Sequence, residues 1–208
     1  MPAARRQLWL VALLFLVAGG VIYVGYHWLR ASSIQLAQGR MAYDAGRYDL
    51  AEAAYLRAVD LAPNNAEAWY WLGISRKNQG QSKPAAEALE KAVTLKPRNA
   101  SWQFECAEAL QWAEQFAKAE QAWQRLLDMV PADDPRAIKG RLNLAKCLAA
   151  QGQLDRAVQM LQQMLAQKDD RNVRFVLAEI LAYAGRLEES TEQWRRALGS
   201  QSESKPEK

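Results

Sequence analysis

The sequence is poor in the side chains that carry out most enzymatic chemistry. Its 208 residues include one histidine, His27, and two cysteines, Cys106 and Cys147, so the chain after His27 has no imidazole to act as a general base. It contains no glycine-rich phosphate-binding loop, no HExxH and no CxxC motif. Carboxylate pairs such as Glu188 and Glu189 are typical of solvated faces or helix caps. We therefore predict a protein that is not an enzyme and needs no cofactor or metal.

Acidic residues are missing from the first 29 positions, which hold Arg5 and Arg6. The rest of the chain carries 25 basic against 23 acidic residues, so most of the body is close to neutral although the formal net charge is +4. Proteins that bind a phosphate backbone concentrate an excess of Lys and Arg on one face. The charge distribution therefore argues against a nucleic-acid partner.

Residues 8–29 form a run of 22 residues without a formally charged side chain. At about 1.5 Å rise per residue, a helix of this length crosses a hydrocarbon core of about 30 Å. A cleaved signal peptide is the alternative, because residues 17–19 read as a small-residue cleavage site. The apolar run, however, continues for nine residues beyond Gly20. We expect an uncleaved transmembrane helix at 8–29, preceded by a basic tail at 1–7.

The positive charges of Arg5 and Arg6 favour an N-terminus that stays on the cytoplasmic side of the membrane. In a bacterial inner membrane this single-pass orientation places residues 30–208 in the periplasm. His27 lies at the interfacial end of the run, where we expect a satisfied or snorkelling side chain rather than a ligand. A reversed topology, with a body that faces the cytosol, is the alternative.

The body of the chain follows a period of 34 residues, marked by Pro63, Pro97 and Pro131. Counted from Ala66 as position 1, large, small and turn-forming residues occupy positions 4, 7, 8, 15, 20, 24, 27 and 32: Trp69, Leu72, Gly73, Gly80, Ala85, Leu89, Ala92 and Pro97. This pattern closely resembles the tetratricopeptide repeat (TPR), which folds as two antiparallel helices.

The same frame fits five consecutive blocks, 32–65, 66–99, 100–133, 138–170 and 171–199. A four-residue insertion, 134–137, precedes the fourth block, and the fifth block has Ser190 where alanine is usual. Asp134 and Pro135 read as an N-cap followed by a first-turn proline, which predicts a first helix about one turn longer. The polar residues 200–208 are expected to form a disordered tail.

The resemblance implies an all-α fold: one N-terminal transmembrane helix followed by a right-handed TPR α-solenoid of about five helix pairs. Small residues at positions 8 and 20 let the two helices of a block approach closely, and the residue at position 15 makes the turn. Trp69, Trp123 and Trp194 occupy core positions, and Cys106 and Cys147 are expected to be buried free thiols rather than a disulfide. We expect the last helix, polar on one side, to act as its own cap.

In this family the first helices line a concave surface that binds peptides or proteins. Carried over by position, the partner-binding groove would be lined by Arg40, Tyr43, Tyr70, Ile74, Lys77, Phe104, Glu108, Trp112, Leu142, Lys146, Phe175 and Tyr183. Packing within helix junctions is the alternative role for the aromatic members. The carboxylate clamp of TPRs that bind heat-shock protein tails is absent, because its positions hold Leu36, Arg40, Trp71, Ser101 and Glu105.

Only about four residues separate Leu29 from the first repeat, a reach of at most about 14 Å, so we expect the repeats to lie against the bilayer. One span followed by TPRs resembles bacterial envelope scaffold subunits of c-type cytochrome maturation, the secretory translocon or exopolysaccharide export. The resemblance implies a non-catalytic, membrane-anchored scaffold that recruits a protein or peptide partner, in an oligomeric state that the sequence leaves open. The alternative is a cytosol-facing receptor or adaptor for protein targeting.

Overall fold

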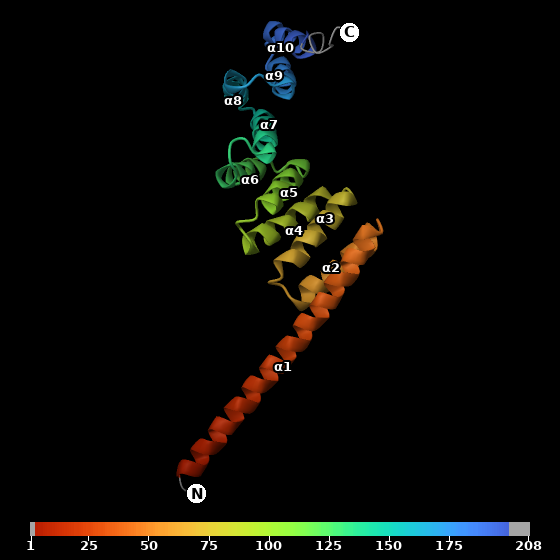
Figure 1. Cartoon of the computed structure of the whole chain (residues 1–208), viewed down its shortest axis with the longest axis vertical. Helices are drawn as coiled ribbons and strands as arrows, with labels where there is room; N and C mark the ends of the chain where they lie inside the picture. Colours follow the sequence, from red (N-terminus) through yellow and green to blue (C-terminus); the bar gives the residue numbers. More distant parts are fainter. Residues whose placement is uncertain (1–2, 200–208) are drawn as a thin grey trace, which may run out of the picture. The chain divides into compact units, whose positions relative to one another are not determined.

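The computed structural model describes the backbone of residues 3–199 and the side chains of residues 13, 14, 16–21, 23–25, 27, 28 and 30–199. Residues 1–2 and the predicted tail at 200–208 lie outside the described residues. So do the side chains of residues 3–12, 15, 22, 26 and 29, which belong to the predicted basic tail and span. The described backbone is all-α (Figure 1).

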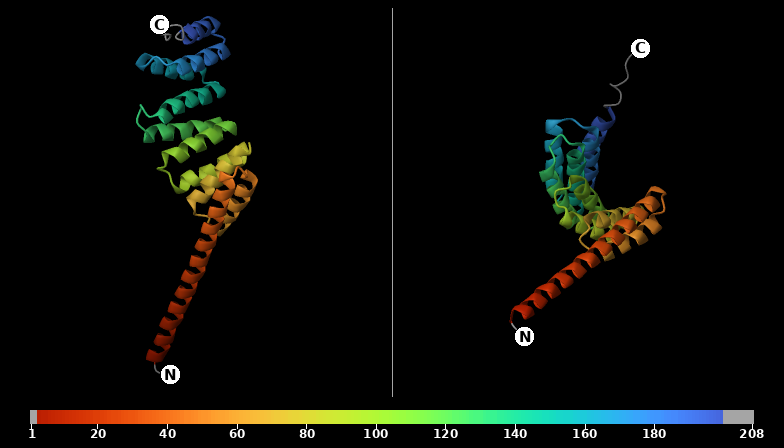
Figure 2. Two further views of the ribbon diagram at one scale, coloured as in Figure 1. Left: turned by 45° about the vertical axis from the view of Figure 1, so that its right-hand side comes forward. Right: turned by 60° about the horizontal axis from the view of Figure 1, so that its bottom comes forward.

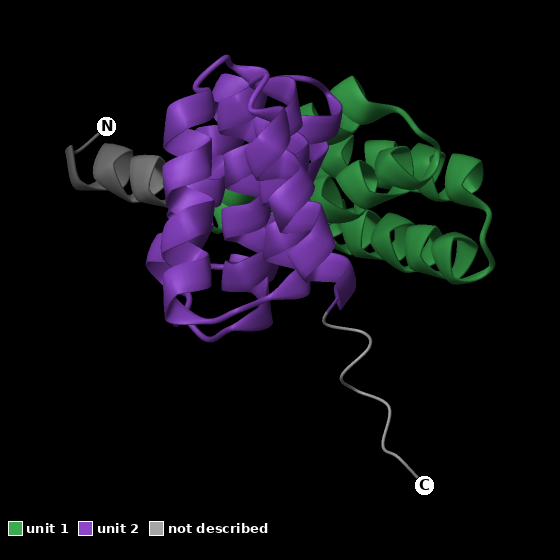
Figure 3. Ribbon diagram, turned by 90° about the horizontal axis from the view of Figure 1, so that it is seen from above, with its two compact units in different colours: residues 1–96 green, residues 97–208 purple. Residues whose placement is uncertain are grey.

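The described residues form ten helices in two compact units, residues 1–96 and 97–208 (Figure 3). The first unit contains α1 (Ala3–Asp44), α2 (Tyr48–Leu61), α3 (Ala66–Asn78) and α4 (Ser82–Leu95). The second contains α5 (Ala100–Trp112), α6 (Phe116–Met129), α7 (Pro135–Ala150), α8 (Leu154–Gln167), α9 (Arg171–Tyr183) and α10 (Leu187–Gly199). Within each unit successive helices pack on one another, as Figure 2 shows.

The turn inside each helix pair lies at position 15, as the repeat predicts. Gly46, Gly80, Gly152 and Gly185 adopt φ angles between 72° and 77°, a left-handed conformation that glycine enters without steric cost. In the third pair Glu114 takes the same position with a φ of 59°. A side chain in this region costs about 1–2 kcal/mol, so the helix pair holds Glu114 in a conformation that it would not choose alone.

Asparagine or aspartate side chains cap the first helix of every pair after the first. Asn65, Asn99, Asp134 and Asp170 accept hydrogen bonds from backbone N–H groups in the first turns of α3, α5, α7 and α9. The cap at Asp134 with Pro135 in the first turn lengthens α7 to 16 residues, against 13 in α3, α5 and α9. The predicted extra turn of this helix is confirmed.

Small residues at positions 8 and 20 bring the paired helices together, as predicted. Ala107 and Ala119 of the third pair, and Ala145 and Ala157 of the fourth, are fully buried. In the fifth pair Ser190 replaces the second alanine, and its hydroxyl donates a hydrogen bond of 2.7 Å to the carbonyl oxygen of Ala178. The serine thus fits the same close approach and adds a bond between the helices.

Both cysteines lie in the core, as predicted. Burial raises the pKa of the Cys147 thiol to about 12, because the surrounding apolar side chains disfavour the thiolate. A hydrogen bond with Trp123 acts in the opposite direction but is the weaker influence. At neutral pH the thiol is therefore protonated and unreactive.

The connection between the apolar run and the first repeat is helical. Residues 29–32 continue α1, which is one helix of 42 residues. No proline or glycine interrupts the segment 29–33, and the Ser33 hydroxyl donates 2.8 Å to the carbonyl oxygen of Arg30, a bond compatible with a helix interior. The short segment between Leu29 and the first repeat is thus part of one continuous helix. No helix that the described residues form is long and apolar enough to cross a membrane.

The last helix does not act as its own cap. Trp123 is fully buried, but the equivalent Trp194 is 38% exposed, and Leu187 and Leu198 of α10 are 64% and 56% exposed. The cause is that, among the described helices, α10 packs against α9 alone. The expectation that Trp194 is a core residue is therefore only partly met.

A largely buried carboxylate ties the first two helix pairs together. Glu52 of α2 accepts hydrogen bonds of 2.8 Å from Nε of Arg76 and 2.8 Å from Nε2 of Gln79, and one of 3.3 Å from Nε2 of Gln81. Burial favours the neutral acid, but the hydrogen bonds and the charge of Arg76 together outweigh it, so the pKa of Glu52 is lowered. Glu52 is thus held ionised in the fold.

Gly73→Ala should destabilise the protein. The added Cβ would lie 2.6 Å from Cγ of buried Leu89 and 3.2 Å from the carbonyl oxygen of Ala85. The resulting overpacking should outweigh the gain in helix propensity of about 1 kcal/mol and lower the unfolding free energy by about 1–2 kcal/mol in urea titrations. Gly140→Ala is the matched control, because its Cβ would meet neighbours at 3.4 Å. Equal effects of the two substitutions would contradict this packing argument.

Glu52→Gln should lower the unfolding free energy at neutral pH by about 1.5–3 kcal/mol, since the charged acceptor for Arg76 is lost. A lowered folded-state pKa contributes stability above the ordinary carboxyl pKa and loses it as pH falls through the folded value. The difference between wild type and variant should therefore shrink below about pH 4. Exposed Glu87 of α4 provides the control substitution. A difference that stays constant from neutral to acidic pH would refute the linkage.

Candidate functional site

In the first unit, three of the predicted groove residues, Arg40, Tyr43 and Tyr70, lie around Trp71. The ring centroids of Tyr43 and Tyr70 lie 5.2 Å and 5.3 Å from that of Trp71, both edge to face. Asn78 donates a hydrogen bond of 3.1 Å from Nδ2 to the Tyr43 hydroxyl, which fixes the ring position. Tyr43 also lies against Tyr48, at 5.3 Å. The tyrosines are thus part of a packed aromatic cluster.

Arg40 is the exposed cation of this cluster. Its guanidinium carbon lies 5.3 Å from the Trp71 ring centroid, and its Nη1 is 3.9 Å from Oε1 of Glu67. The ion pair is solvent-exposed and contributes little stability, so the guanidinium can exchange Glu67 for another acidic group at low cost. Lys77 is half-buried, whereas Ile74 is buried and offers little surface to a partner.

In the second unit, the predicted face is formed by α5, α7 and α9, which contact one another in succession. Phe104 of α5 packs edge to face on Trp123, with 5.2 Å between ring centroids. Lys139 of α7 lies over the Phe104 ring, with its Nζ 4.8 Å from the ring centroid and 2.8 Å from Oε1 of Glu108. Phe104 and Glu108 are therefore already engaged in contacts within the unit.

Phe175 of α9 has the same kinds of partner as Phe104, although its cation comes from its own helix. Its ring lies 5.2 Å from Trp194 of the second helix, and the guanidinium carbon of Arg171 lies 4.9 Å from its centroid. In both pairs a phenylalanine packs on a tryptophan beneath it and lies under a cation. These contacts favour the packing alternative for the two phenylalanines.

The predicted groove residues that remain open to a partner lie toward the C-terminal ends of the first helices of this unit. Trp112 is 55% exposed and Tyr183 is 77% exposed. Lys146 of α7 is exposed and Leu142 is half-buried. We call Trp112, Lys146 and Tyr183 the open face of the second unit. Exposed aromatic rings and a cation on successive first helices suit recognition of an extended segment that carries apolar and acidic side chains.

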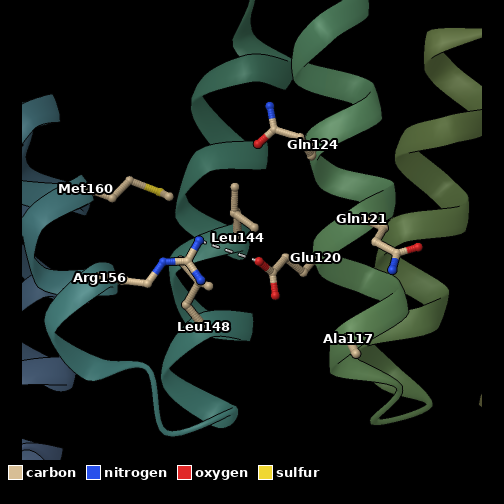
Figure 4. A pocket seen from close by; sticks show the side chains of 8 residues that line it. All are labelled: Ala117, Glu120, Gln121, Gln124, Leu144, Leu148, Arg156 and Met160. Carbon is tan, nitrogen blue, oxygen red and sulfur yellow. Dashed lines mark ion pairs between the residues drawn. The ribbon is translucent and has the colours of Figure 1, made fainter.

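A pocket of about 380 Å³ lies on a different side of the second unit, between α6 and α8 (Figure 4). Leu144 and Leu148 of α7 line it, and in Figure 4 Arg156 of α8 points toward Glu120 of α6, with 3.8 Å between Nη2 and Oε1. Gln151 donates a further hydrogen bond of 2.9 Å to Glu120. Because its charged groups already bind one another, we interpret this pocket as part of the polar junction between the third and fourth helix pairs, not as a ligand site.

Sequence reasoning missed this recurring polar junction. Glu120 and Gln151 repeat the arrangement of Glu52 and Gln79 two repeats earlier, with a glutamate at position 21 and a glutamine at position 14 of the following block. The matching positions were a detectable signal. Trp71 and Lys139 were missed too. Trp71 lies next to the expected groove position of Tyr70, whereas Lys139 occupies position 2 of the fourth block, a concave-surface position of this family that the predicted groove left out.

No metal centre emerges from the described residues, since they contain no group of three or more His, Cys, Asp or Glu side chains that could hold an ion.

Family models of tetratricopeptide repeats match three segments of the chain. A TPR repeat model matches residues 39–80, and two tetratricopeptide repeat models match residues 66–99 and 132–180. These models indicate no catalytic family, and tetratricopeptide repeats are typically non-catalytic interaction modules. No curated protein matches the sequence significantly.

Solved structures support the same fold. A crystal structure of MamA protein is 20% identical, with a TM-score of 0.69 over 81% of this chain and 91% of that one. A structure of MamA 41-end from Desulfovibrio magneticus RS-1 is 14% identical, with a TM-score of 0.69 and coverage of 85% and 98%. YrrB, described as a TPR protein with an unusual peptide-binding site, is 22% identical, with a TM-score of 0.66 and coverage of 79% and 84%.

Four observations indicate the same fold: the turns at position 15, the small residues at positions 8 and 20, the matched family models and the similar structures. The chain belongs to the tetratricopeptide repeat proteins.

Proposed function

We propose that this protein is a non-catalytic, membrane-anchored TPR scaffold, which recruits a protein or peptide partner to an envelope complex through the open face of its second unit. The observation that carries the proposal is the combination of Trp112, Lys146 and Tyr183 on first helices, the surface with which this repeat family binds other polypeptides. A few exposed aromatic anchors with a polar rim supply most of the binding energy in such contacts.

The likeness to YrrB supports the choice of a peptide as ligand, because that protein has a similar fold and is described as having a peptide-binding site. The charge balance of the body makes an extended acidic or neutral segment a suitable ligand for Lys146, flanked by apolar residues that bury against Trp112 and Tyr183. A partner of this kind would bind without chemical change.

The membrane anchor rests on the N-terminal part of α1. Among the described residues, α1 packs only on α2 and α3. The large apolar side chains exposed along consecutive turns of its N-terminal part are Leu13, Leu14, Leu16, Val17, Val21, Tyr23, Val24 and Trp28. A continuous apolar surface of this kind needs cover from lipid or protein. The 22-residue run without charge at 8–29 favours lipid.

An anchor in this position would be joined rigidly to the first repeat, because α1 runs without a break into the helix that packs on α2. The Ser32 hydroxyl donates 3.0 Å to the carbonyl oxygen of Ala58 at the point where the two helices first meet. We place the repeats in the periplasm of a single-pass inner-membrane protein, since Arg5 and Arg6 precede the run. Cytochrome c maturation, the secretory translocon and exopolysaccharide export remain the three candidate pathways, and a cytosol-facing targeting adaptor is the second candidate function.

A photo-crosslinking amino acid at Trp112 or at Tyr183 should capture the same partner in native membranes, because both positions belong to the open face. Exposed Arg125 on α6 is the control position and should capture nothing in common with them. Lys146→Ala combined with Tyr183→Ala should reduce capture from position 112 by at least about tenfold. Identical products from positions 112 and 125, or capture that survives the double substitution, would overturn the binding face.

A cysteine introduced at Ser202 should react with a membrane-impermeant maleimide in intact cells whose outer membrane is permeabilised, if the repeats face the periplasm. The native cysteines supply a low background because both are buried. Labelling that requires lysis of the inner membrane would reject the periplasmic orientation and favour the cytosol-facing adaptor.

A further inference from the structure

The last helix carries an apolar stripe that nothing in the described chain covers. Leu187, Thr191, Trp194 and Leu198 recur at intervals of four, three and four residues, so they follow one flank of α10. Leu187 and Leu198 are more than half exposed, and Trp194, whose ring centroid lies 5.2 Å from that of Phe175, is still 38% exposed. We call these four residues the α10 stripe.

The preceding repeat shows what such a flank normally does. The residues 33 positions earlier, in α8, are Leu154, Val158, Leu161 and Leu165, and α9 of the next repeat packs on this helix. Val158 and Leu161 are buried there. The α10 stripe is thus built to receive a helix, and within the described chain no helix occupies it.

The composition of residues 200–208 is unlike that of a helix that packs on an apolar stripe. Residues 200–208 read SQSESKPEK, with one proline and otherwise polar or charged side chains. A segment of this composition has no large apolar side chain to bury against Trp194 or the two leucines. A second copy of this chain offers an apolar surface of the matching kind.

The stripe is complementary to itself when two copies of α10 run antiparallel. A twofold axis between residues 192 and 193 places Leu187 of one copy opposite Leu198 of the other, and Thr191 opposite Trp194. The small threonine then meets the large tryptophan, and each leucine meets a leucine. Successive helices within the repeats also run antiparallel, so this pairing repeats the geometry seen between α8 and α9.

Charge favours the same arrangement. The acidic residues of α10, Glu188, Glu189 and Glu192, lie in its first half, whereas Arg195 and Arg196 lie in its second half. An antiparallel pair brings the acidic half of each copy beside the basic half of the other. Glu188 and Arg195 border the stripe on the same side, so the twofold axis puts Glu188 of one copy within about one helical turn of Arg195 of the other. A parallel pair would instead oppose like charges.

From these observations we infer that the α10 stripe is a homodimer interface, in which two copies of this chain pair through antiparallel α10 helices. The inference is independent of the proposed partner and of the membrane anchor. One helix pair buries less surface than the roughly 1,200–2,000 Å² of a standard stable interface, so we expect a dimer that dissociates readily.

Short bismaleimide cross-linking of full-length protein tests the arrangement, with one exposed cysteine introduced at Thr191, Leu187 or Arg196 beside the buried Cys106 and Cys147. Residues 191 of the two copies lie about 4.5 Å apart along the helix axes, whereas residues 187 lie about 16 Å apart. Thr191→Cys should therefore give cross-linked dimer, and Leu187→Cys little or none by itself. A mixture of Leu187→Cys and Leu198→Cys proteins should give a heterodimeric product. Arg196→Cys, exposed on another flank of α10, is the control for random collision.

Charge reversal distinguishes a contact between two copies from an effect of the substitution on α10 within one copy. Glu188→Arg in the Thr191→Cys background should lower the yield of cross-linked dimer by at least about threefold, because Arg195 of the other copy then meets a like charge. Adding Arg195→Glu should restore the yield. Failure of Thr191→Cys to cross-link above the Arg196→Cys level, or failure of the second reversal to restore the product, would overturn the inference.

Discussion

The whole fold depends on one close approach between helices, at positions 8 and 20 of each repeat. Glycine, alanine or serine at these positions lets the two helix axes come together until larger side chains interlock around them. At Gly73 a single added carbon would collide with Leu89. Because no repeat buries its apolar surface alone, each close pair within a unit also packs on the neighbouring pair of that unit.

This stacking explains which side chains remain for function. Tryptophans on second helices lie beneath phenylalanines of the first helices, as Trp123 lies beneath Phe104, and lysine or arginine covers the ring. Such aromatic residues stabilise the stack and leave little ring surface for a ligand. Trp112 and Tyr183 occupy the last turn of their helices, where the neighbouring repeat gives less cover, so they remain exposed. The same lack of a neighbour exposes the stripe on α10, at the C-terminal edge of the described stack.

The polar junctions add a second level of organisation. Glu52 and Glu120 each accept hydrogen bonds from glutamine in the turn region of the next repeat, which fixes how consecutive helix pairs meet. The satisfied carboxylates are compatible with burial because several donors surround them. In the second unit, Glu120 and its partners also form the polar wall of the pocket between α6 and α8. Because these groups bind one another, we do not assign a ligand to that pocket.

Periodicity in the sequence determined the repeat frame, the turns at Gly80 and Gly152, the cap at Asp134 and the burial of both cysteines. Each of these depends on local backbone preference or on a position in the repeat, which composition and spacing encode. The tertiary structure decided that α1 is continuous, that Phe104 is covered while Trp112 is exposed, and that Trp194 lacks a neighbour. These outcomes depend on which helix packs against which, and a side chain's exposure is set by that neighbour rather than by its own position in the repeat.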